Sequence, residues 1–415
     1  MTSTTSPGPG PVTAPVVASG PLRWPFLLLT GLLFSFFLAA SAPSPLLVVF
    51  QRDWGFSAGL LTLAFGIYAL ALLGALLVFG SLSDHLGRRP VVLAATGLEL
   101  AAMLLFVRAD GIAGLLLART VQGLATGLAS GALSAAVVEA APESHKRLGA
   151  LFSSVSPLAG LAVGALLTGL LLSGLAHPAP WIFGALALLF ALNLPLLWLW
   201  PEAARRRPGA WSSLRPRVAV PASVRQDFWQ GLPVLVVVWA VGGLYLSLVP
   251  SLLRQLFEVR QGWLPGAVIA TLMGFGALAP TLLRHLPAQR ALTLAQRALA
   301  AGLLGLLWAL ETRSLTGFWL ASAVAGVGFG GGFSAQVQRL SQQVEAGRRG
   351  ELFAAIFVLS YLAFSLPAML AGCLVRPLGL QASALGYLGG LLALSVFALL
   401  AERRPPARPL GPAAR

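Results

Sequence analysis

Charged side chains are scarce in this chain. Asp, Glu, Lys and Arg together account for 10% of the 415 residues, whereas 57% are hydrophobic, and the mean hydropathy is +0.84. Soluble domains carry roughly 25% charged residues. The composition therefore excludes a soluble protein with one apolar helix and indicates a polytopic membrane protein.

Cysteine and histidine are nearly missing as well. The only cysteine, Cys373, lies in an apolar run and cannot form an internal disulfide, and the four histidines are scattered. No acid–histidine cluster offers a metal or nucleophile site, and no glycine-rich loop offers a phosphate site. We therefore expect no cofactor, no metal and no enzymatic activity.

A cleavable signal peptide is not predicted. Residues 1–22 lack its charged start and apolar core, and they are predicted to form a disordered cytoplasmic tail. The net charge of +15 would suit nucleic acid, but the basic residues fall between apolar stretches. The lipid bilayer, with its anionic cytoplasmic surface, is the expected partner, and nucleic acid is not.

Twelve apolar segments are long enough to cross a membrane as helices, which need about 20 residues each. A barrel would instead show short alternating segments. The sequence therefore predicts an all-α polytopic membrane protein, with spans at 24–49, 58–80, 90–108, 111–139, 149–175, 179–200, 230–253, 264–284, 291–310, 316–337, 352–374 and 381–400.

One long basic connection, 201–229, interrupts the short loops and carries six arginines. It divides the chain into two predicted bundles of six helices, 23–200 and 230–401, followed by a tail at 402–415. Of the 28 Lys and Arg residues, two lie within spans, and six lie on one side of the membrane: Arg52, Arg108, Arg254, Arg260, Arg313 and Arg376. The remaining 20 lie on the other side, which predicts that both termini are cytoplasmic, in the cell inner membrane.

The most distinctive loop, 80–92, joins the second and third spans and reads Gly-Ser-Leu-Ser-Asp-His-Leu-Gly-Arg-Arg-Pro-Val-Val. Gly80 and Gly87 permit tight turns, and Asp84 lies four and five residues before Arg88 and Arg89. Opposite charges so close to hydrocarbon need partners. An ordinary positive loop that only sets orientation would explain the arginines, but neither Asp84 nor the glycines.

This loop resembles the signature of the major facilitator superfamily, Gly-x-Leu-Ala-Asp-Arg-x-Gly-Arg-Arg-x-x-Leu. Ser83, His85 and Val92 depart from it mildly. The resemblance implies two six-helix bundles and a gating role for Gly80, Asp84, Gly87, Arg88 and Arg89, which would stabilise the outward-facing state. The opening of the connection, Pro201-Glu202-Ala203-Ala204-Arg205, resembles the Pro-Glu-x-x-Arg that follows the sixth helix in that family.

Three polar groups fall inside predicted spans of the first half. Arg119, Gln122 and Gly123 resemble the fourth-helix motif Arg-x-x-Gln-Gly, whose arginine is tied to proton movement in proton-coupled members. Glu99, at a matching depth, is predicted to pair with Arg119 and is a candidate proton site. The alternatives are a purely structural pair or side chains that reach toward the membrane surface.

Other polar residues in apolar context are candidates for the substrate cavity: Tyr245, Ser247, Gln336 and Tyr361. Each could equally bond a helix backbone. The reading of proton antiport is weakened by two features, because the first span has no acid and Ala165 replaces the proline found in the fifth helix of many antiporters.

The resemblance predicts a monomeric secondary active transporter that moves a small molecule by alternating access, with proton-linked efflux as the leading interpretation. The alternatives are an uptake permease or uniporter for sugars or metabolites, and a sensor or scaffold on the same fold that does not transport.

Overall fold

The computed structural model describes residues 24–142, 144, 146–202, 208–216 and 218–402. Within these ranges no strand is present, and twelve helical segments are long and apolar enough to cross a membrane. The predicted fold class and number of spans are confirmed. The predicted tails at 1–22 and, except for Glu402, at 402–415 lie outside the described residues, as does part of the 201–229 connection.

The first half of the chain supplies six spans and a short surface helix. Its helices are α1 (Trp24–Ser41), α2 (Pro43–Trp54), α3 (Ala58–Phe79), α4 (Leu82–Leu86), α5 (Arg88–Arg108), α6 (Ile112–Ala140), α7 (Lys146–Gly174) and α8 (Pro178–Leu199). In the described part of the connection that follows, the helical elements are α9 (Ala210–Ser213) and a 3₁₀ turn, η2 (Ala222–Val224).

The second half repeats the plan. Its helices are α10 (Arg225–Ser247), α11 (Val249–Gln255), α12 (Trp263–Leu283), α13 (Ala288–Thr312), α14 (Leu315–Gln342), the 3₁₀ turn η3 (Ala346–Arg348), α15 (Arg349–Leu378) and α16 (Leu380–Glu402). Several helices run past the apolar segments, because polar residues continue the helix beyond the hydrocarbon. For example, α10 begins at Arg225 and carries Asp227 in its first turn.

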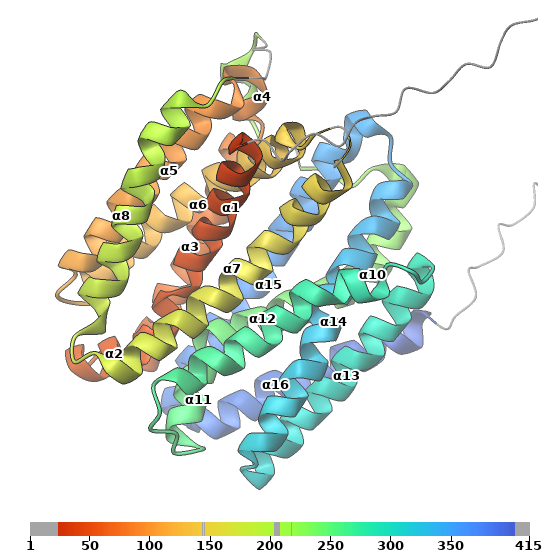
Figure 1. Cartoon of the computed structure of the whole chain (residues 1–415). Helices are drawn as coiled ribbons and strands as arrows, with labels where there is room; N and C mark the ends of the chain where they lie inside the picture. Colours follow the sequence, from red (N-terminus) through yellow and green to blue (C-terminus); the bar gives the residue numbers. More distant parts are fainter. Residues whose placement is uncertain (1–23, 143, 145, 203–207, 217, 403–415) are drawn as a thin grey trace, which may run out of the picture.

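Each half packs as its own bundle, and the two halves meet mainly along two helix pairs. In the first half α3 and α5 pack on α6, and α1 packs on α7; in the second half α13 and α12 pack on α14, and α10 packs on α15. The halves contact each other through α7 with α12 and α3 with α15, which lie in the middle of the molecule (Figure 1).

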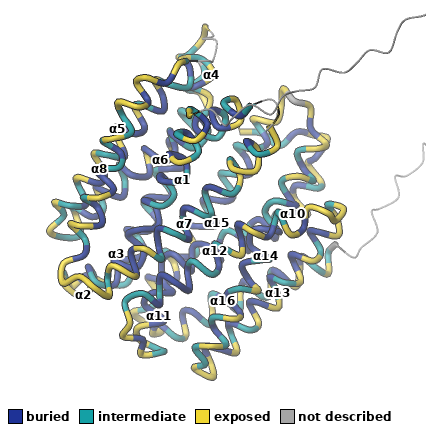
Figure 2. The backbone as a smooth tube through the Cα atoms, in the orientation of Figure 1, coloured by how far each residue is buried: buried dark blue, intermediate teal, exposed yellow. Residues whose placement is uncertain are grey.

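An even number of spans places both ends of the described chain on one face of the molecule. We call this the latch face, because α4, the start of α5 and the short helix α9 lie there. We call the other the far face, where α2 and α11 end (Figure 1). Many large apolar side chains are exposed on the outer surface. The buried positions lie along the inside of both bundles (Figure 2). Such a surface suits lipid tails.

Largely exposed tryptophans mark both edges of this apolar surface. Trp24 and Trp198 lie at the latch face, and Trp181 and Trp308 lie at the far face. Tryptophan prefers the boundary between hydrocarbon and headgroups. The two groups therefore mark the two membrane–water interfaces expected for helices of this length.

The first and seventh spans are each broken near the far face. In both spans the break lies at a Pro-Ser pair, and a Leu-Leu pair follows within a few residues. Pro43 and Ser44 open α2, and Pro250 and Ser251 fall in the first turn of α11. Proline lacks the N–H that would continue the hydrogen-bond ladder, so the helix bends or stops there. The shared break at equivalent spans shows the internal repeat of the two halves.

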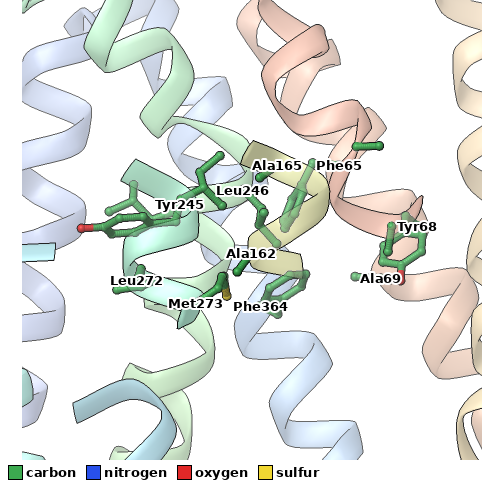
Figure 3. Packing of buried hydrophobic residues seen from close by; sticks show 14 of the residues in the cluster. Phe65, Tyr68, Ala69, Ala162, Ala165, Tyr245, Leu246, Leu272, Met273 and Phe364 are labelled. Atoms are coloured by element: carbon green, nitrogen blue, oxygen red, sulfur yellow. The ribbon is translucent and has the colours of Figure 1, made fainter. Parts of the chain in front are cut away.

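The halves are in close contact toward the far face. A Cβ added at Gly266 of α12 would lie 3.0 Å from the backbone carbon of Ala165 on α7, so only glycine permits this approach. Phe65 of α3 and Phe364 of α15 also meet, with ring centroids 4.8 Å apart. Figure 3 shows this apolar contact, with Ala162, Ala165, Leu246, Met273 and Phe364 gathered between the helices.

Candidate functional site

The 80–89 loop is built around one turn. Gly87 has a φ of +98°, a conformation that residues with a Cβ rarely adopt. This turn ends α4 and starts α5, so that Arg88 Nη1 lies 2.6 Å from Asp84 Oδ1. Arg88 Nη2 also lies 3.0 Å from Glu139 Oε1 at the end of α6. One arginine thus joins the loop to the fourth span.

The connection between the halves docks on the same loop through Glu202. Its carboxylate accepts hydrogen bonds from the backbone N–H groups of Arg88 at 3.2 Å and Arg89 at 2.8 Å. These N–H groups have no acceptor within α5, because they lie at its N-terminus, where a negatively charged group is favourable. A Cβ at Gly87 would collide with this carboxylate. Glycine at 87 therefore serves both the turn and the docking of Glu202.

Further contacts hold the connection and the end of α8 against this loop. Ser81 Oγ donates to the Ser213 carbonyl at 3.1 Å, His85 Nδ1 lies 3.0 Å from the Pro208 carbonyl, and Arg89 bonds the Trp198 carbonyl. We call this set of contacts around Gly80–Arg89 the latch. In the part of the chain that the structure describes, its hydrogen bonds and ion pairs stay within the first half and the connection. The sequence had pointed to Asp84 and the arginines, but not to Glu139 as their partner.

A polar network lies buried within the first half, and Arg119 of α6 is its centre. This side chain is only 2% exposed. Its Nε donates to the Ala64 carbonyl of α3 at 3.1 Å, and its Nη1 donates to the Ala40 carbonyl of α1 at 3.2 Å. The guanidinium carbon lies 4.2 Å from the ring centroid of Tyr68, a cation–π contact. Arg119 thus faces the bundle interior rather than the lipid.

Gln122 connects this arginine to two other helices. Its Oε1 accepts from Arg119 Nη1 at 2.7 Å, while its Nε2 donates to the Ala39 carbonyl at 3.0 Å and to Glu99 Oε1 at 3.2 Å. The residue four positions after Ala39 is Pro43, which has no N–H. Gln122 therefore supplies the donor that Pro43 withholds, and the network is tied to the break in the first span.

Glu99 of α5 is fully buried, and its Oε2 has no hydrogen-bond partner. The predicted direct pair between Glu99 and Arg119 is not formed. Gln122 stands between the two groups and bonds both of them. Buried polar atoms without a partner are rare in folded proteins and call for an explanation.

Gly123 and Tyr68 complete the geometry. A Cβ added at Gly123 would lie 2.9 Å from Ala71 Cβ and would also meet the Tyr68 carbonyl. The small residue lets α6 and α3 approach closely, which brings the Tyr68 ring to Arg119. Tyr68 had no signal in the sequence, because an aromatic residue on an apolar span is ordinary.

The polar candidates of the second half divide into two kinds. Tyr245 is buried and donates to Ser322 Oγ at 2.6 Å, and Ser247 bonds the Gly243 carbonyl of its own helix at 2.6 Å. Both satisfy partners inside the second bundle, and in Figure 3 the Tyr245 ring lies far from Tyr68. Their placement supports the structural alternative and not a role in a substrate cavity.

Gln336 and Tyr361 differ from these two. Gln336 is buried with neither amide atom bonded. Tyr361 packs on Trp239, with ring centroids 5.1 Å apart, and Trp239 also contacts Phe364 at 5.8 Å. The indole Nε1 of Trp239 and the hydroxyl of Ser360 are likewise buried without partners. Trp239, Tyr361 and Phe364 thus form a wall of aromatic rings, in which the Trp239 indole Nε1 is an unused hydrogen-bonding group.

An ion pair that the sequence reasoning missed lies at the latch-face end of the second half. Arg339 Nη2 of α14 lies 2.7 Å from Asp227 Oδ1 of α10, and both side chains are half-buried. Both residues lie outside the apolar segments, where polarity alone gives no signal. No group of three His, Cys, Asp or Glu able to hold a metal is found among the described residues.

Comparison with known families decides the identity of the fold. The family model described as Major Facilitator Superfamily matches residues 29–368. The chain belongs to the major facilitator superfamily. This family consists of transporters, and its fold carries the two six-helix halves seen here. The latch and the Arg119 network both lie inside the matched region.

Solved structures share the fold of this major facilitator superfamily chain. The human organic anion transporter MFSD10 (TETRAN) is 19% identical, with a TM-score of 0.66, and the match covers 92% of this chain and all of that one. A bacterial homologue of the human lysosomal transporter Spinster is 16% identical, with a TM-score of 0.70, covering 94% of this chain and all of the other. The nucleoside transporter NupG is 13% identical, with a TM-score of 0.70, covering 92% and 100%.

Proposed function

We propose that this chain is a monomeric secondary active transporter that exports a small, partly apolar molecule by alternating access, coupled to proton movement. The observation that carries the proposal is the buried network of Arg119, Gln122 and Glu99. Burying an arginine at membrane depth costs about 3 kcal/mol on insertion scales, so a purely structural helix contact would be made more cheaply with apolar residues. Ionisable groups placed there support a role in moving charge.

The network also offers a route from proton binding to helix movement. A proton gained or lost at Glu99 changes the acceptor that Gln122 faces, and the same amide holds the Ala39 carbonyl at 3.0 Å. That carbonyl lies just before the break between α1 and α2. A change at Glu99 is therefore passed to the broken first span, whose end forms part of the far face.

The second half supports the substrate class. Trp239, Tyr361 and Phe364 form an aromatic wall, and the Trp239 Nε1 and Gln336 amide are unpartnered. Pockets for small molecules are mostly apolar with a few polar groups that set orientation. This wall suits a compound with an apolar body and a hydrogen-bonding group that can reach the Trp239 Nε1.

We place the latch face in the cytoplasm and the protein in the cell inner membrane. The support is the excess of Lys and Arg in the loops of that face. With this orientation, the contact of the halves at the far face closes the path to the exterior. Gly80, Asp84, Gly87, Arg88 and Arg89 then act from the cytoplasmic side as the gating loop.

The decisive experiment is a flux assay in proteoliposomes, with a panel of labelled compounds and with or without an imposed pH gradient. We expect gradient-driven flux for the native chain and loss of the gradient dependence in Glu99→Gln. The control is Glu258→Gln, an exposed acid that lies away from the network. Native flux that ignores the gradient would refute proton coupling and favour a uniporter or uptake permease.

A second variant tests transport itself. Asp84→Asn removes the 2.6 Å ion pair with Arg88, and we expect it to abolish flux while the protein remains folded and monodisperse. Asp53→Asn, which also removes an ion pair with a neighbouring arginine, is the matched control. If no member of the panel moves through the native chain, the non-transporting sensor or scaffold becomes the better reading.

A further inference from the structure

A cavity lies at the far face, away from the Arg119 network and the latch. Its volume is about 500 Å³, and both halves line it. The first half contributes α2 and the end of α7, and the second half contributes α11, the 259–262 segment and the start of α12. The size falls within the range of small-molecule sites. The cavity exists only where the two halves are together at this face.

The charge of the lining is of one sign. It includes Arg52, Arg254 and Arg260, and no Asp or Glu. Arg52 bonds its neighbour Asp53 at 2.8 Å. Among the described residues, Arg254 and Arg260 have no ion pair or hydrogen bond with another side chain. Arg254 and Arg260 are thus two uncompensated cations at one cavity, and they repel each other unless an anion joins them.

Helix ends explain only part of this charge. Arg52 and Arg254 lie in the last turns of α2 and α11, where a cation offsets the helix dipole. Arg260 lies outside any helix, so that role does not apply to it. It stands instead beside the N-terminus of the 21-residue helix α12, whose first turn, at Gly262 and Trp263, also lines the cavity and has no side-chain cap. Both features favour an anion.

We propose that this cavity binds a small anion with an apolar body, such as an aromatic sulfonate or carboxylate. The arginines take the anionic group, and Pro45, Val48 and Trp263 provide apolar contact. Because Arg52 comes from one half and Arg254 and Arg260 from the other, the bound anion bridges the halves. It therefore favours the state that is closed at the far face. This consequence rests on the proposed alternating access, but the binding of the anion itself does not depend on it.

The test uses the full chain in nanodiscs of zwitterionic phosphatidylcholine, with 4-fluorobenzenesulfonate observed by fluorine NMR. We expect saturable binding that inorganic sulfate competes away. Exposed ion pairs contribute up to about 1 kcal/mol each. Binding should therefore fall roughly threefold in Arg260→Gln and about tenfold or more in Arg254→Gln with Arg260→Gln. These positions are exposed, so the variants should fold.

The matched control is Arg376→Gln, which removes an exposed arginine from the same face but not from the cavity. Equal loss in this control, or native affinity in the double variant, would overturn the site. A repeat in nanodiscs that contain phosphatidylglycerol separates two sources of the anionic group. Weaker probe binding there identifies a lipid headgroup as a competitor for the same arginines, and unchanged binding identifies a free anion; both support the site. Since no flux is measured, failure of transport would leave this result unaffected.

Discussion

Gln122→Leu is the sharpest perturbation of the buried network. The side chain makes three hydrogen bonds, to Arg119 Nη1 at 2.7 Å, the Ala39 carbonyl at 3.0 Å and Glu99 Oε1 at 3.2 Å. Side-chain hydrogen bonds within membranes average about 0.6 kcal/mol and reach about 1.7. Because two of the partners are ionisable and Pro43 offers Ala39 no donor, we expect a loss of about 2 to 3 kcal/mol in unfolding free energy.

The assay is reversible unfolding in mixed micelles, with Thr120→Val as the control. Thr120 follows Arg119 on the same helix, and its hydroxyl bonds only the Leu116 carbonyl at 2.8 Å. We expect a loss of about 0.6 kcal/mol or less in this control. The same pair of variants is then measured for flux, where Gln122→Leu should lose gradient-driven transport. Equal stability of the two variants, together with intact gradient dependence in Gln122→Leu, would refute the linking role of the amide.

Three further outcomes follow from the contacts. Gly123→Val should lower folded yield and cost about 1–3 kcal/mol, because the new atoms overlap α3, whereas Gly97→Val, with open space around it, should be tolerated; equal effects would contradict the packing argument. A double-mutant cycle between Asp227→Asn and Arg339→Gln should give a coupling of about 0.5–1 kcal/mol by denaturation, and zero coupling would show that the pair is idle. Glu202→Ala should raise amide exchange at the start of α5 by roughly tenfold, measured by mass spectrometry, since two N–H groups lose their acceptor.

The spans were predictable because a membrane imposes a length of apolar sequence that few other structures need. Their ends were less predictable. The seventh span was expected to start at residue 230, but α10 begins at Arg225. Residues 225–229 are polar or aromatic, so their hydropathy does not indicate a membrane span. The helix nevertheless includes them, and Asp227 forms an ion pair with Arg339 of α14 at 2.7 Å. This contact joins residues that are more than 100 positions apart in the chain, so it cannot be predicted from the local sequence.

The candidate site was partly predictable for a similar reason. Arg119, Gln122 and Glu99 stand out because polar groups inside spans are rare. Polarity does not indicate which of these groups bond each other. A direct Glu99–Arg119 pair was expected, but Gln122 lies between the two groups and bonds both. Tyr245 and Ser247 were equally polar in context, but they find partners within their own bundle. Whether a polar group is satisfied locally depends on side-chain directions that hydropathy does not encode.

The two broken spans show how one repeated fold acquires two chemistries. Pro43 and Pro250 each remove a donor near the far face, at equivalent places in the two halves. In the first half, the carbonyl left open at Ala39 is taken by Gln122, which joins it to Arg119. In the second half, no described side chain donates to the matching carbonyl of Leu246.

The second half instead presents the aromatic wall of Trp239, Tyr361 and Phe364. Charge is thus placed on one half and apolar contact on the other. Phe65 and Phe364 meet across the boundary at 4.8 Å, so a substrate that separates these rings also moves α3, which carries Tyr68 against Arg119. Phe65 and Tyr68 lie three residues apart on α3, so in the proposed mechanism the substrate and the proton act on the same helix, which is the element that couples them.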